Sequence, residues 1–311
     1  MPCAAITGWG AALPDQVLTN ADLEARLDTS DRWIVERTGI RERRVGGTTT
    51  GLAVQATRQA LSRAGMDPAV VDLLIVSTNT PDQPVPATAS LVQGELGLAG
   101  GAMDVNSGCS GFVYALVLAN GAIATGLERV VVTASDTVSR IVDPEDRSTA
   151  VLFGDAAGSV VLEAVPGEPM LLGWDLGADG GAASLLYQPR GGYVYMDGRE
   201  VFRRAVRATA ASAQAALERA KVDVSEVALF IPHQANLRII EAVCQRLGLP
   251  MERSMLIVER TGNTSSASIP VALAEAVEEG RLSEGDLVLM SGFGAGMTWG
   301  SAVLRWGRRP A

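Results

Sequence analysis

Short apolar runs alternate with longer amphipathic segments along the chain, and this alternation limits the possible fold more than any other feature. Residues 73–77 form a continuous apolar run, as expected of a strand buried on both faces. Residues 51–64 carry apolar side chains at helical spacing and end at Gly65, a common helix stop. Such alternation in both halves predicts an α/β fold with parallel sheets and helices between them. We predict strands over residues 4–7, 73–77, 102–105, 129–134, 159–163, 228–231, 255–258, 287–291 and 301–305, and helices over 51–64, 90–96, 110–125, 202–221, 237–247 and 266–280.

The length of 311 residues suits two domains, at roughly 150 residues each. A stretch rich in proline and glycine, residues 166–169, is the candidate boundary. We therefore predict an N-terminal half over residues 1–165, which carries Cys109, and a C-terminal half over residues 166–311. The two halves share no close sequence repeat. A second glycine-rich stretch, residues 177–192, is a candidate loop over a substrate.

The charge and cysteine content exclude several classes of protein. The net charge of −9 gives no basic field of the kind that nucleic-acid binding needs. No apolar run reaches the roughly 18 residues of a membrane span, and the N-terminus lacks the basic and apolar regions of a signal peptide. The 3 cysteines are too few for a disulfide framework. We therefore predict a cytoplasmic protein that binds neither nucleic acid nor a membrane.

Cys109 lies in a turn rich in glycine and serine, residues 106–111, between a predicted strand and a predicted helix. This position puts its sulfur at the carboxyl end of a sheet, where open α/β folds bind ligands. A helix N-terminus also stabilises a thiolate. Cys109 is therefore a candidate nucleophile. The alternative is a small buried hydrophobic residue, which is the role of most cysteines.

The chain contains a single histidine, His233, at the end of the predicted strand 228–231. Histidine alone has an unperturbed pKa near neutrality, so any imidazole chemistry at that pH must use this residue. Asn263 lies in another turn, residues 261–265. Cysteine, histidine and asparagine together supply a nucleophile, a base or donor, and an amide donor. The alternatives are a hydrogen-bonded core histidine and a turn asparagine with left-handed backbone.

A glycine-rich segment, residues 292–296, follows the predicted strand 287–291. A backbone so free of side chains can aim N–H groups at a developing oxyanion. A dinucleotide loop is a poor alternative, because neither a βαβ unit nor an acidic residue follows the segment. The single lysine, Lys221, ends a polar helix and is expected at the surface. A Walker loop and a pyridoxal phosphate Schiff base therefore do not fit.

Residues 32–44 place five arginines around Trp33. A tryptophan can stack on an adenine ring while arginines hold phosphates. The alternative is a solvated helix held by pairs of glutamate and arginine, which the charge pattern alone slightly favours.

Taken together, the motifs resemble those of β-ketoacyl-acyl-carrier-protein synthase III, in the thiolase superfamily, over almost the whole chain. The active-site motifs are Gly108-Cys109-Ser110-Gly111-Phe112, Pro232-His233-Gln234-Ala235-Asn236-Leu237-Arg238 and Gly262-Asn263-Thr264-Ser265. Further matching segments are residues 29–34, 37–40, 143–147, 153–155 and 298–301. The resemblance implies a thiolase-like α/β fold in which two similar halves, each a five-stranded mixed sheet with flanking helices, stack as αβαβα layers. It also implies a homodimer.

The resemblance further implies an acyltransferase that condenses an acyl-CoA starter with malonyl-acyl carrier protein, releases CO2 and forms 3-oxoacyl-acyl carrier protein for fatty-acid or polyketide synthesis. Cys109 would hold the acyl group as a thioester, and His233 and Asn263 would hydrogen-bond the malonyl thioester carbonyl. N–H groups of Cys109 and Ala295 would form the oxyanion hole. No metal or bound cofactor is implied, because CoA and carrier-protein thioesters enter as substrates. The other implied positions are Trp33, Arg37, Arg147 and Arg199 for CoA, Arg238 and Arg246 for the carrier protein, and Val85, Val138, Phe153, Phe202 and Phe293 for the acyl pocket.

Several positions depart from the family pattern. An aromatic side chain that often lines the acyl pocket is replaced near Val85, Arg199 stands where an amide is familiar, and Ser291 stands where an acid is common. Gly108 and Ser110 also flank the cysteine where alanines are frequent. These departures leave the starter open. They allow a specialised homologue that acylates another nucleophile or takes a dicarboxylic or other unusual acyl-CoA.

Two other classes of protein fit the sequence less well. A thiol hydrolase with cysteine, histidine and asparagine is one, but the residues around His233 do not favour it. A non-catalytic partner subunit is the other, but it usually lacks the nucleophile, and Cys109 is present.

Overall fold

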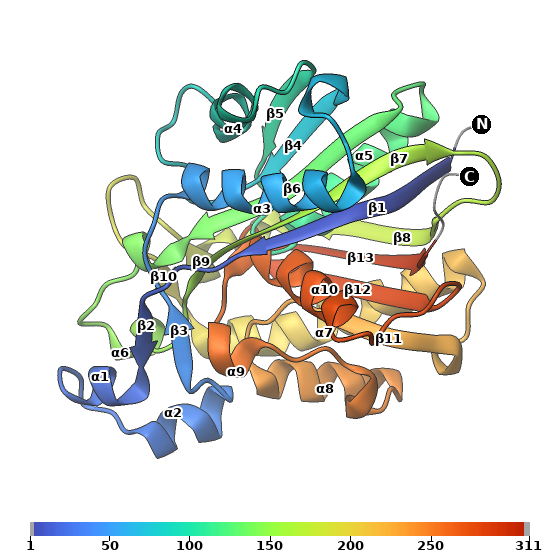
Figure 1. Ribbon diagram of the computed structural model, residues 1–311. Helices are drawn as coiled ribbons and strands as arrows, with labels where there is room; N and C mark the ends of the chain where they lie inside the picture. Colours follow the sequence, from blue (N-terminus) through green and yellow to red (C-terminus); the bar gives the residue numbers. More distant parts are fainter. Residues whose placement is uncertain (1–2, 308–311) are drawn as a thin grey trace.

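The computed structural model describes residues 3–307, which form five alternating layers of helices and sheets (Figure 1). The helical layers consist of α3 (Thr49–Ala64), α4 (Thr88–Leu96), α5 (Gly111–Ala124), α10 (Ser268–Glu278), α7 (Gly198–Ala220) and α8 (Leu237–Leu247). Helices α3 and α4 cover the outer face of the first sheet, and α5 and α10 lie between the two sheets. Helix α7 covers the outer face of the second sheet, with α8 packed against it. The αβαβα layering of a thiolase-like fold is confirmed.

The first sheet has five strands in the order β1-β7-β6-β4-β5. Strands β6, β4 and β5 run parallel, whereas β1 and β7 pair antiparallel with their neighbours. The sheet is therefore mixed, as the resemblance implies, and the parallel sheet predicted from strand–helix alternation is wrong. These strands are β1 (Cys3–Ala12), β4 (Leu73–Ser77), β5 (Gly101–Val105), β6 (Arg129–Thr137) and β7 (Asp155–Val165).

The second sheet has the order β11-β12-β13-β8. Its strands are β8 (Leu171–Ala178), β11 (Val227–Pro232), β12 (Leu287–Gly294) and β13 (Thr298–Arg305). Strand for strand, β8, β13, β12 and β11 repeat the order and directions of β1, β7, β6 and β4. The two halves therefore share one topology. Strand β8 was not predicted from the sequence.

The strand predicted over residues 255–258 is wrong, and with it the fifth strand of the second sheet. By analogy with β5, that strand would lie beside β11. Only an isolated bridge between Phe230 and Ser254 occupies the position among the described residues. The second sheet thus has four strands where five were expected.

The buried side chain of Gln234 explains why no strand forms there. Its Nε2 donates to the carbonyl of Met255 at 3.0 Å. Its Oε1 accepts the N–H groups of Ile257 at 2.9 Å and Val258 at 3.2 Å. Backbone groups that a side chain has satisfied do not need a neighbouring strand.

Shorter elements gather at one end of the layered core, toward the left of Figure 1. They are β2 (Val17–Thr19), α1 (Asn20–Glu24), α2 (Asp31–Thr38), β3 (Glu42–Arg44), α6 (Arg147–Ala150), β9 (Leu186–Tyr187), β10 (Tyr195–Met196) and α9 (Val258–Thr261). The glycine-rich stretch 177–192 contains the end of β8, a 3-10 turn and β9.

The connection between β7 and β8, from Val165 to Leu171, contains the predicted boundary at residues 165/166. The division into two domains there stays a prediction. One hydrophobic core cluster draws on both sheets and on α5 and α10. None of the helices in residues 3–307 has the length and apolar character needed to cross a bilayer.

Candidate active site

Cys109, His233 and Asn263 line one pocket, although they are far apart in the sequence. Cys109 lies in the turn between β5 and α5, His233 directly follows β11, and Asn263 lies between α9 and α10. The pocket therefore combines a cysteine from the N-terminal half with polar side chains from the C-terminal half. Its other walls are largely apolar.

Two glycines allow the turn of Cys109 to pack against the turn between β12 and β13. Gly108 has a φ of +55°, a conformation that favours glycine. A Cβ atom at Gly294 would lie 2.2 Å from the backbone nitrogen of Cys109, and one at Gly108 would lie 2.7 Å from that of Ala295. A side chain at either glycine would therefore clash with the backbone of the other turn.

Burial raises the pKa of the Cys109 thiol from 9.0 to about 12. A hydrogen bond from Ser265 works against this rise, and the nearby charge of Asp136 adds to it. The start of α5 stabilises a thiolate by at most about 2 kcal/mol. That is less than the roughly 4 kcal/mol that a rise of three pKa units represents. Contrary to the expectation from helix position alone, Cys109 therefore rests as a thiol at neutral pH.

Ser265 is the polar neighbour of the sulfur, with its Oγ 3.4 Å from Sγ of Cys109. Its Oγ also accepts a hydrogen bond from Nδ2 of Asn79 at 3.0 Å. A thiolate at Cys109 would therefore receive the hydroxyl hydrogen of Ser265. Ser265 has a φ of +54°, a backbone conformation that is unfavourable for most residues other than glycine.

The side chain of Asn263 is oriented by the same residue, because its Oδ1 accepts the N–H of Ser265 at 2.9 Å. The amide nitrogen Nδ2 is then the atom left to face the pocket. The backbone of Asn263 is held by an N–H to the carbonyl of Leu152 at 2.8 Å and by an N–H from Gly154 at 3.0 Å. Gly262, and not Asn263, takes the positive φ, so the alternative of a left-handed turn asparagine is wrong.

His233 is buried, and its ring Nδ1 lies 2.7 Å from Oγ of Ser268. Its backbone N–H donates to the carbonyl of Ser291 at 2.8 Å. Burial lowers the pKa of His233 to about 3, so the ring is neutral near pH 7. In the described structure the ring bonds to Ser268 and the sulfur to Ser265. The described residues show no direct hydrogen bond between Cys109 and His233, which is the pair that a thiol hydrolase needs.

The buried carboxylate of Asp136 ties the two halves together behind the cysteine. It accepts the N–H of Asn79 at 2.7 Å from the first half. It accepts the hydroxyl of Ser266 at 2.6 Å and its N–H at 3.0 Å from the second half. Asn79 also donates to Ser265, so this carboxylate fixes the neighbours of Cys109 from both sides.

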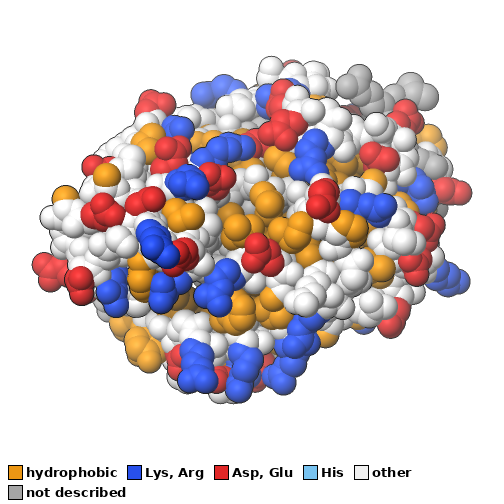
Figure 2. Space-filling view, turned by 90° about the horizontal axis from the view of Figure 1, so that it is seen from below, with side chains coloured by type: hydrophobic (Ala, Val, Ile, Leu, Met, Phe, Trp, Pro, Cys, Tyr) orange, Lys and Arg blue, Asp and Glu red, His pale blue; other side chains and the backbone are white. Residues whose placement is uncertain are grey.

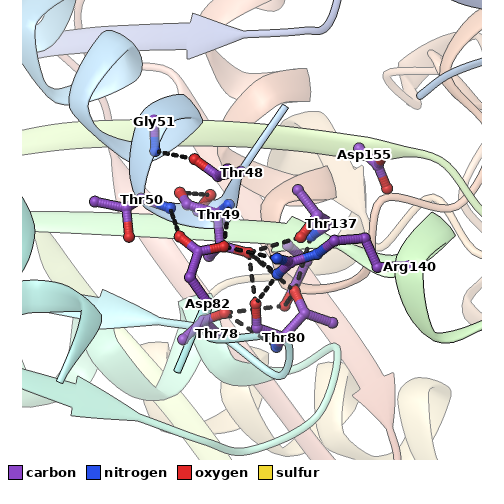
Figure 3. A network of polar contacts seen from close by, with 12 residues as sticks. Thr48, Thr49, Thr50, Gly51, Thr78, Thr80, Asp82, Thr137, Arg140 and Asp155 are labelled. Atoms are coloured by element: carbon purple, nitrogen blue, oxygen red, sulfur yellow. Dashed lines mark hydrogen bonds and ion pairs between the residues drawn. The ribbon is translucent and has the colours of Figure 1, made fainter. Parts of the chain in front are cut away.

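A second network holds the loop that begins with Asn79 (Figure 3). Asp82 accepts the N–H groups of Thr49 at 3.1 Å and Thr50 at 2.8 Å, at the start of α3. Arg140 donates to Asp82 at 2.8 Å and to the carbonyl of Thr80 at 2.8 Å. Figure 3 shows Arg140 reaching across to this loop, which continues to Val85. Sequence reasoning missed this network and the residues that support the site.

Trp33 lies under two of the arginines predicted for CoA. The guanidinium carbon of Arg37 is 4.5 Å, and that of Arg147 is 4.9 Å, from the centre of a Trp33 ring. Helix α2 also contains the ion pair Arg32–Glu36, at 2.7 Å, as the alternative of a helix with glutamate–arginine pairs expects. Binding of CoA at this segment stays a prediction. Arg199 is exposed in the first turn of α7, and it contacts none of these three among the described interactions.

Arg238 and Arg246 are exposed on α8. Eight residues of helix separate them by about 12 Å. The guanidinium carbon of Arg238 is 5.8 Å from the ring centre of Phe202, which lines the pocket. Arg238 therefore stands at the edge of the pocket, and Arg246 lies farther along the same helix.

The residues predicted for the acyl pocket divide into two groups. Phe153, Phe202 and Phe293 line the pocket of Cys109. Val138 is buried and packs in a cluster with Phe153, but it does not line the pocket. Val85 is 81% exposed and lines no part of it. A role for these two valines in the acyl pocket therefore stays a prediction.

Two signals in the sequence could have identified the supporting residues. The run from Thr264 to Ser268 contains five small residues, four of which carry hydroxyl groups, directly after Asn263. Gln234 directly follows His233. Over residues 3–307, no three His, Cys, Asp or Glu side chains come together in a way that could hold a metal ion.

Known proteins match the chain over nearly its full length. Residues 103–180 match the family described as 3-oxoacyl-[acyl-carrier-protein (ACP)] synthase III, and residues 217–306 match that of its C-terminal part. β-Ketoacyl-[acyl-carrier-protein] synthase III of Roseiflexus castenholzii is 49% identical, with 97% of this chain and 98% of the relative covered. The corresponding protein of Symbiobacterium thermophilum is 46% identical over the same shares.

Solved structures agree with these matches. That of 3-oxoacyl-[acyl-carrier-protein] synthase III from Aquifex aeolicus is 45% identical with a TM-score of 0.94, and the match covers 97% of this chain and 100% of that one. The priming β-ketosynthase of the R1128 polyketide pathway is 36% identical with a TM-score of 0.93, covering 99% and 97%.

Proposed function

The chain belongs to the 3-oxoacyl-[acyl-carrier-protein] synthase III family and is an acyltransferase, and we propose that it condenses an acyl-CoA starter with malonyl-acyl carrier protein. One observation carries this proposal: Cys109, His233 and Asn263 line a single, largely apolar pocket. A nucleophile and two hydrogen-bond donors beside an apolar cavity suit the joining of two thioesters.

In the first stage, the sulfur of Cys109 attacks the carbonyl carbon of acyl-CoA. The new carbon–sulfur bond forms as the bond to CoA breaks, and the proton of the thiol leaves with the CoA sulfur. The N–H groups of Cys109 and Ala295 stabilise the oxyanion in between. The close packing of Gly108 and Gly294 supports this assignment, because it brings the turns that carry the two nitrogens together.

In the second stage, malonyl-acyl carrier protein loses CO2 and its carbanion attacks the acyl carbon on Cys109. A carbon–carbon bond forms, the bond between the acyl carbon and the sulfur of Cys109 breaks, and 3-oxoacyl-acyl carrier protein results. The sulfur leaves as a thiolate, which takes up one proton from solvent and restores the thiol. His233 and Asn263 donate hydrogen bonds to the malonyl thioester carbonyl, whose oxygen gains charge as CO2 departs. The low pKa of His233 supports a role as neutral donor, because an imidazolium would be costly in this pocket.

Two alternatives fit less well. A thiol hydrolase would need a hydrogen bond between the histidine and the sulfur, but the polar neighbour of the Cys109 sulfur among the described residues is Ser265. A specialised homologue that acylates another nucleophile, or takes an unusual acyl-CoA, would use the same cysteine. The relatives named above do not favour it, since they are named as β-ketoacyl-[acyl-carrier-protein] synthases.

For CoA, we propose that the adenine stacks on Trp33 and that Arg37 and Arg147 bind its phosphates. The two arginines already stand over the tryptophan ring, which supports this site. Because Arg147 lies only 4.9 Å from the ring centre, it would move outward to admit the base. Arg199, exposed at the start of α7, would contact a phosphate from the other side.

For the carrier protein, we propose docking at Arg238 and Arg246 on α8. Figure 2 views the molecule from below Figure 1, and on this face blue basic side chains lie among red acidic and orange apolar ones. With a net charge of −9, the protein would repel an acidic partner at long range. Binding would therefore depend on local cations such as Arg238, which stands at the pocket edge.

For the acyl chain, we propose the apolar region lined by Phe153, Phe202 and Phe293. No charged side chain lines it, which favours an apolar starter over a dicarboxylic one.

We propose that two copies pair as a homodimer through the outer edge of β5. This strand lies at the edge of its sheet, so the backbone N–H and C=O groups on its outer side can pair with another strand. Nearby apolar side chains are exposed in the single chain, with Met103 at 40% and Val85 at 81%. We further propose two domains over residues 1–165 and 166–311 and a cytoplasmic location, for the reasons given by the sequence.

The test of the reaction is mass spectrometry of the carrier protein after incubation with acyl-CoA and malonyl-acyl carrier protein. The proposal predicts a new carrier-protein species. Its mass differs from that of malonyl-acyl carrier protein by the loss of CO2 and the replacement of one hydrogen by the acyl group. Free fatty acid with unchanged malonyl-carrier protein would instead indicate hydrolysis and refute the condensation.

A further inference from the structure

Ser268 is a fully buried serine in the first turn of α10 whose hydroxyl group meets the ring of His233. Its Oγ lies 2.7 Å from Nδ1 of the histidine. The same Oγ accepts the backbone N–H of Gln234 at 3.2 Å. One serine oxygen thus joins the imidazole to the residue that follows it in the chain.

The direction of these two bonds follows from what each group can donate. The N–H of Gln234 is a donor only, so it occupies a lone pair of the Ser268 oxygen. The hydroxyl hydrogen then needs an acceptor, and Nδ1 of His233 is its only partner among the described interactions. If Nδ1 carried the proton instead, the oxygen would accept two donors and its own hydrogen would be buried without an acceptor, which is unfavourable.

The N–H of Gln234 is itself held in place. The side chain of Gln234 donates to the carbonyls of Pro232 at 2.9 Å and Met255 at 3.0 Å, so the turn after β11 is anchored on both sides. Ser268 therefore meets a fixed donor and has little freedom to turn its hydrogen away from His233.

From this geometry we propose that Ser268 is a positioning residue, which donates its hydroxyl hydrogen to Nδ1 of His233 and so keeps the ring proton on Nε2. This proposal rests on the proposed function in one respect, because the Nε2–H of His233 is the group that would donate a hydrogen bond to the malonyl carbonyl. Asn263 is oriented in the same way by the N–H of Ser265, which turns its Nδ2 to the pocket. The hydrogen bonds from Ser268 and Ser265 would thus orient His233 and Asn263 so that both donate to the malonyl carbonyl oxygen.

The first test is the tautomer of His233 in the intact wild-type protein. Because His233 is the only histidine, nitrogen-15 NMR of histidine-labelled protein reports this ring alone. The proposal predicts an unprotonated Nδ1 and a protonated Nε2 at neutral pH. A proton on Nδ1 would overturn it, whether or not any variant folds.

The second test compares Ser268→Ala with Ser268→Thr, which keeps the hydroxyl group. Loss of the hydroxyl is expected to shift the NMR signals of both ring nitrogens toward a tautomer mixture. It should also slow malonyl decarboxylation about tenfold, which corresponds to the loss of one hydrogen bond from the transition state. Acylation of Cys109 by acyl-CoA should change less than twofold, and Ser268→Thr should restore both the signals and the rate. Ser212→Ala is the matched control, since Ser212 is buried and its hydroxyl has no partner in the described structure.

The outcomes separate this proposal from the proposed function. If Ser268→Ala leaves the tautomer and the decarboxylation rate unchanged, the positioning role is refuted and condensation is untouched. Equal slowing of acylation and decarboxylation would refute it as well, since it would indicate general damage to the pocket. If the wild type acylates Cys109 but does not decarboxylate malonyl-carrier protein, the proposed function fails, while the tautomer still decides the role of Ser268.

Discussion

The Sγ atom of Cys109 lies 3.4 Å from the Oγ atom of Ser265, a residue that comes from the opposite half of the chain. Ser265 in turn accepts a hydrogen bond from Asn79 at 3.0 Å and donates its N–H to Asn263 at 2.9 Å. One serine therefore contacts the sulfur of Cys109, where it would stabilise a thiolate, and also orients the side-chain amide of Asn263. Ser265 makes these contacts at a φ of +54°, which is uncommon for a residue other than glycine.

We expect Ser265→Ala to slow alkylation of Cys109 by iodoacetamide about tenfold at fixed pH. A hydrogen bond to a charged group contributes about 1.5–3 kcal/mol, and the thiolate loses this bond in the variant. The rate is measured by mass spectrometry of the peptide that contains Cys109. Ser212→Ala serves as the control for loss of a buried hydroxyl without a partner in the described structure. Equal alkylation rates in Ser265→Ala and the wild type would show that Ser265 does not stabilise the thiolate of Cys109.

The single histidine should not titrate in the folded protein near neutral pH. Burial lowers the pKa of His233 from 6.5 to about 3, so between these values the unfolded chain binds a proton that the folded chain does not. The stability from the neutral ring is thus present above pH 6.5 and is lost as the pH falls toward 3. We expect the ring C–H signals to stay constant from about pH 8 to about pH 5. A midpoint near 6.5 would contradict the burial of the ring.

The same shift predicts a pH-dependent difference in stability between the wild type and His233→Gln. Below pH 6.5, the wild type should lose unfolding free energy relative to the variant by about 1.4 kcal/mol per pH unit. Urea unfolding at several pH values measures this slope. A constant difference across that range would show that the ring is protonated alike in both states.

Trp33→Ala should raise the KM for acyl-CoA about tenfold, because stacking of one base on an aromatic ring contributes about 1–3 kcal/mol. Trp174→Ala is the matched control: Trp174 is 41% exposed and also has an arginine over its ring, Arg219 at 5.4 Å. A similar rise in both variants, or in neither, would refute a CoA site at Trp33.

Arg238→Glu should raise the KM for malonyl-acyl carrier protein about fivefold, a modest effect because exposed ion pairs are weak. Loading of Cys109 from acyl-CoA should not change. Arg58→Glu on α3 makes the same change of charge at another exposed position and serves as the control. Unchanged carrier-protein kinetics in Arg238→Glu, measured at low ionic strength, would rule out docking at this arginine.

Local sequence patterns predicted the α/β class and the separate parts of the site, whereas the αβαβα layers followed only from the resemblance to a family. Most of the apolar runs became strands, and Cys109 and His233 stand at strand ends as expected. The meeting of these residues with Asn263 followed only from the resemblance to a family, because their distance in space depends on how two sheets stack. Periodicity carries no information on that arrangement.

The structure differs from the predictions made from local sequence where contacts between distant residues override a local sequence pattern. Residues 255–258 have the composition of a strand, but Gln234 takes up their backbone groups. Cys109 stands before a helix, but burial raises the pKa of its thiol more than the helix lowers it. Both effects depend on tertiary neighbours that a sequence window does not contain.

Intact-mass spectrometry of the protein with acyl-CoA tests the central claim most directly, because it observes the acyl group on the nucleophile. We predict a mass increase of one acyl group on Cys109 that disappears when malonyl-acyl carrier protein is added. Cys109→Ala should show no increase. An adduct that persists in Cys109→Ala, or one that malonyl-acyl carrier protein does not discharge, would contradict condensation through this cysteine.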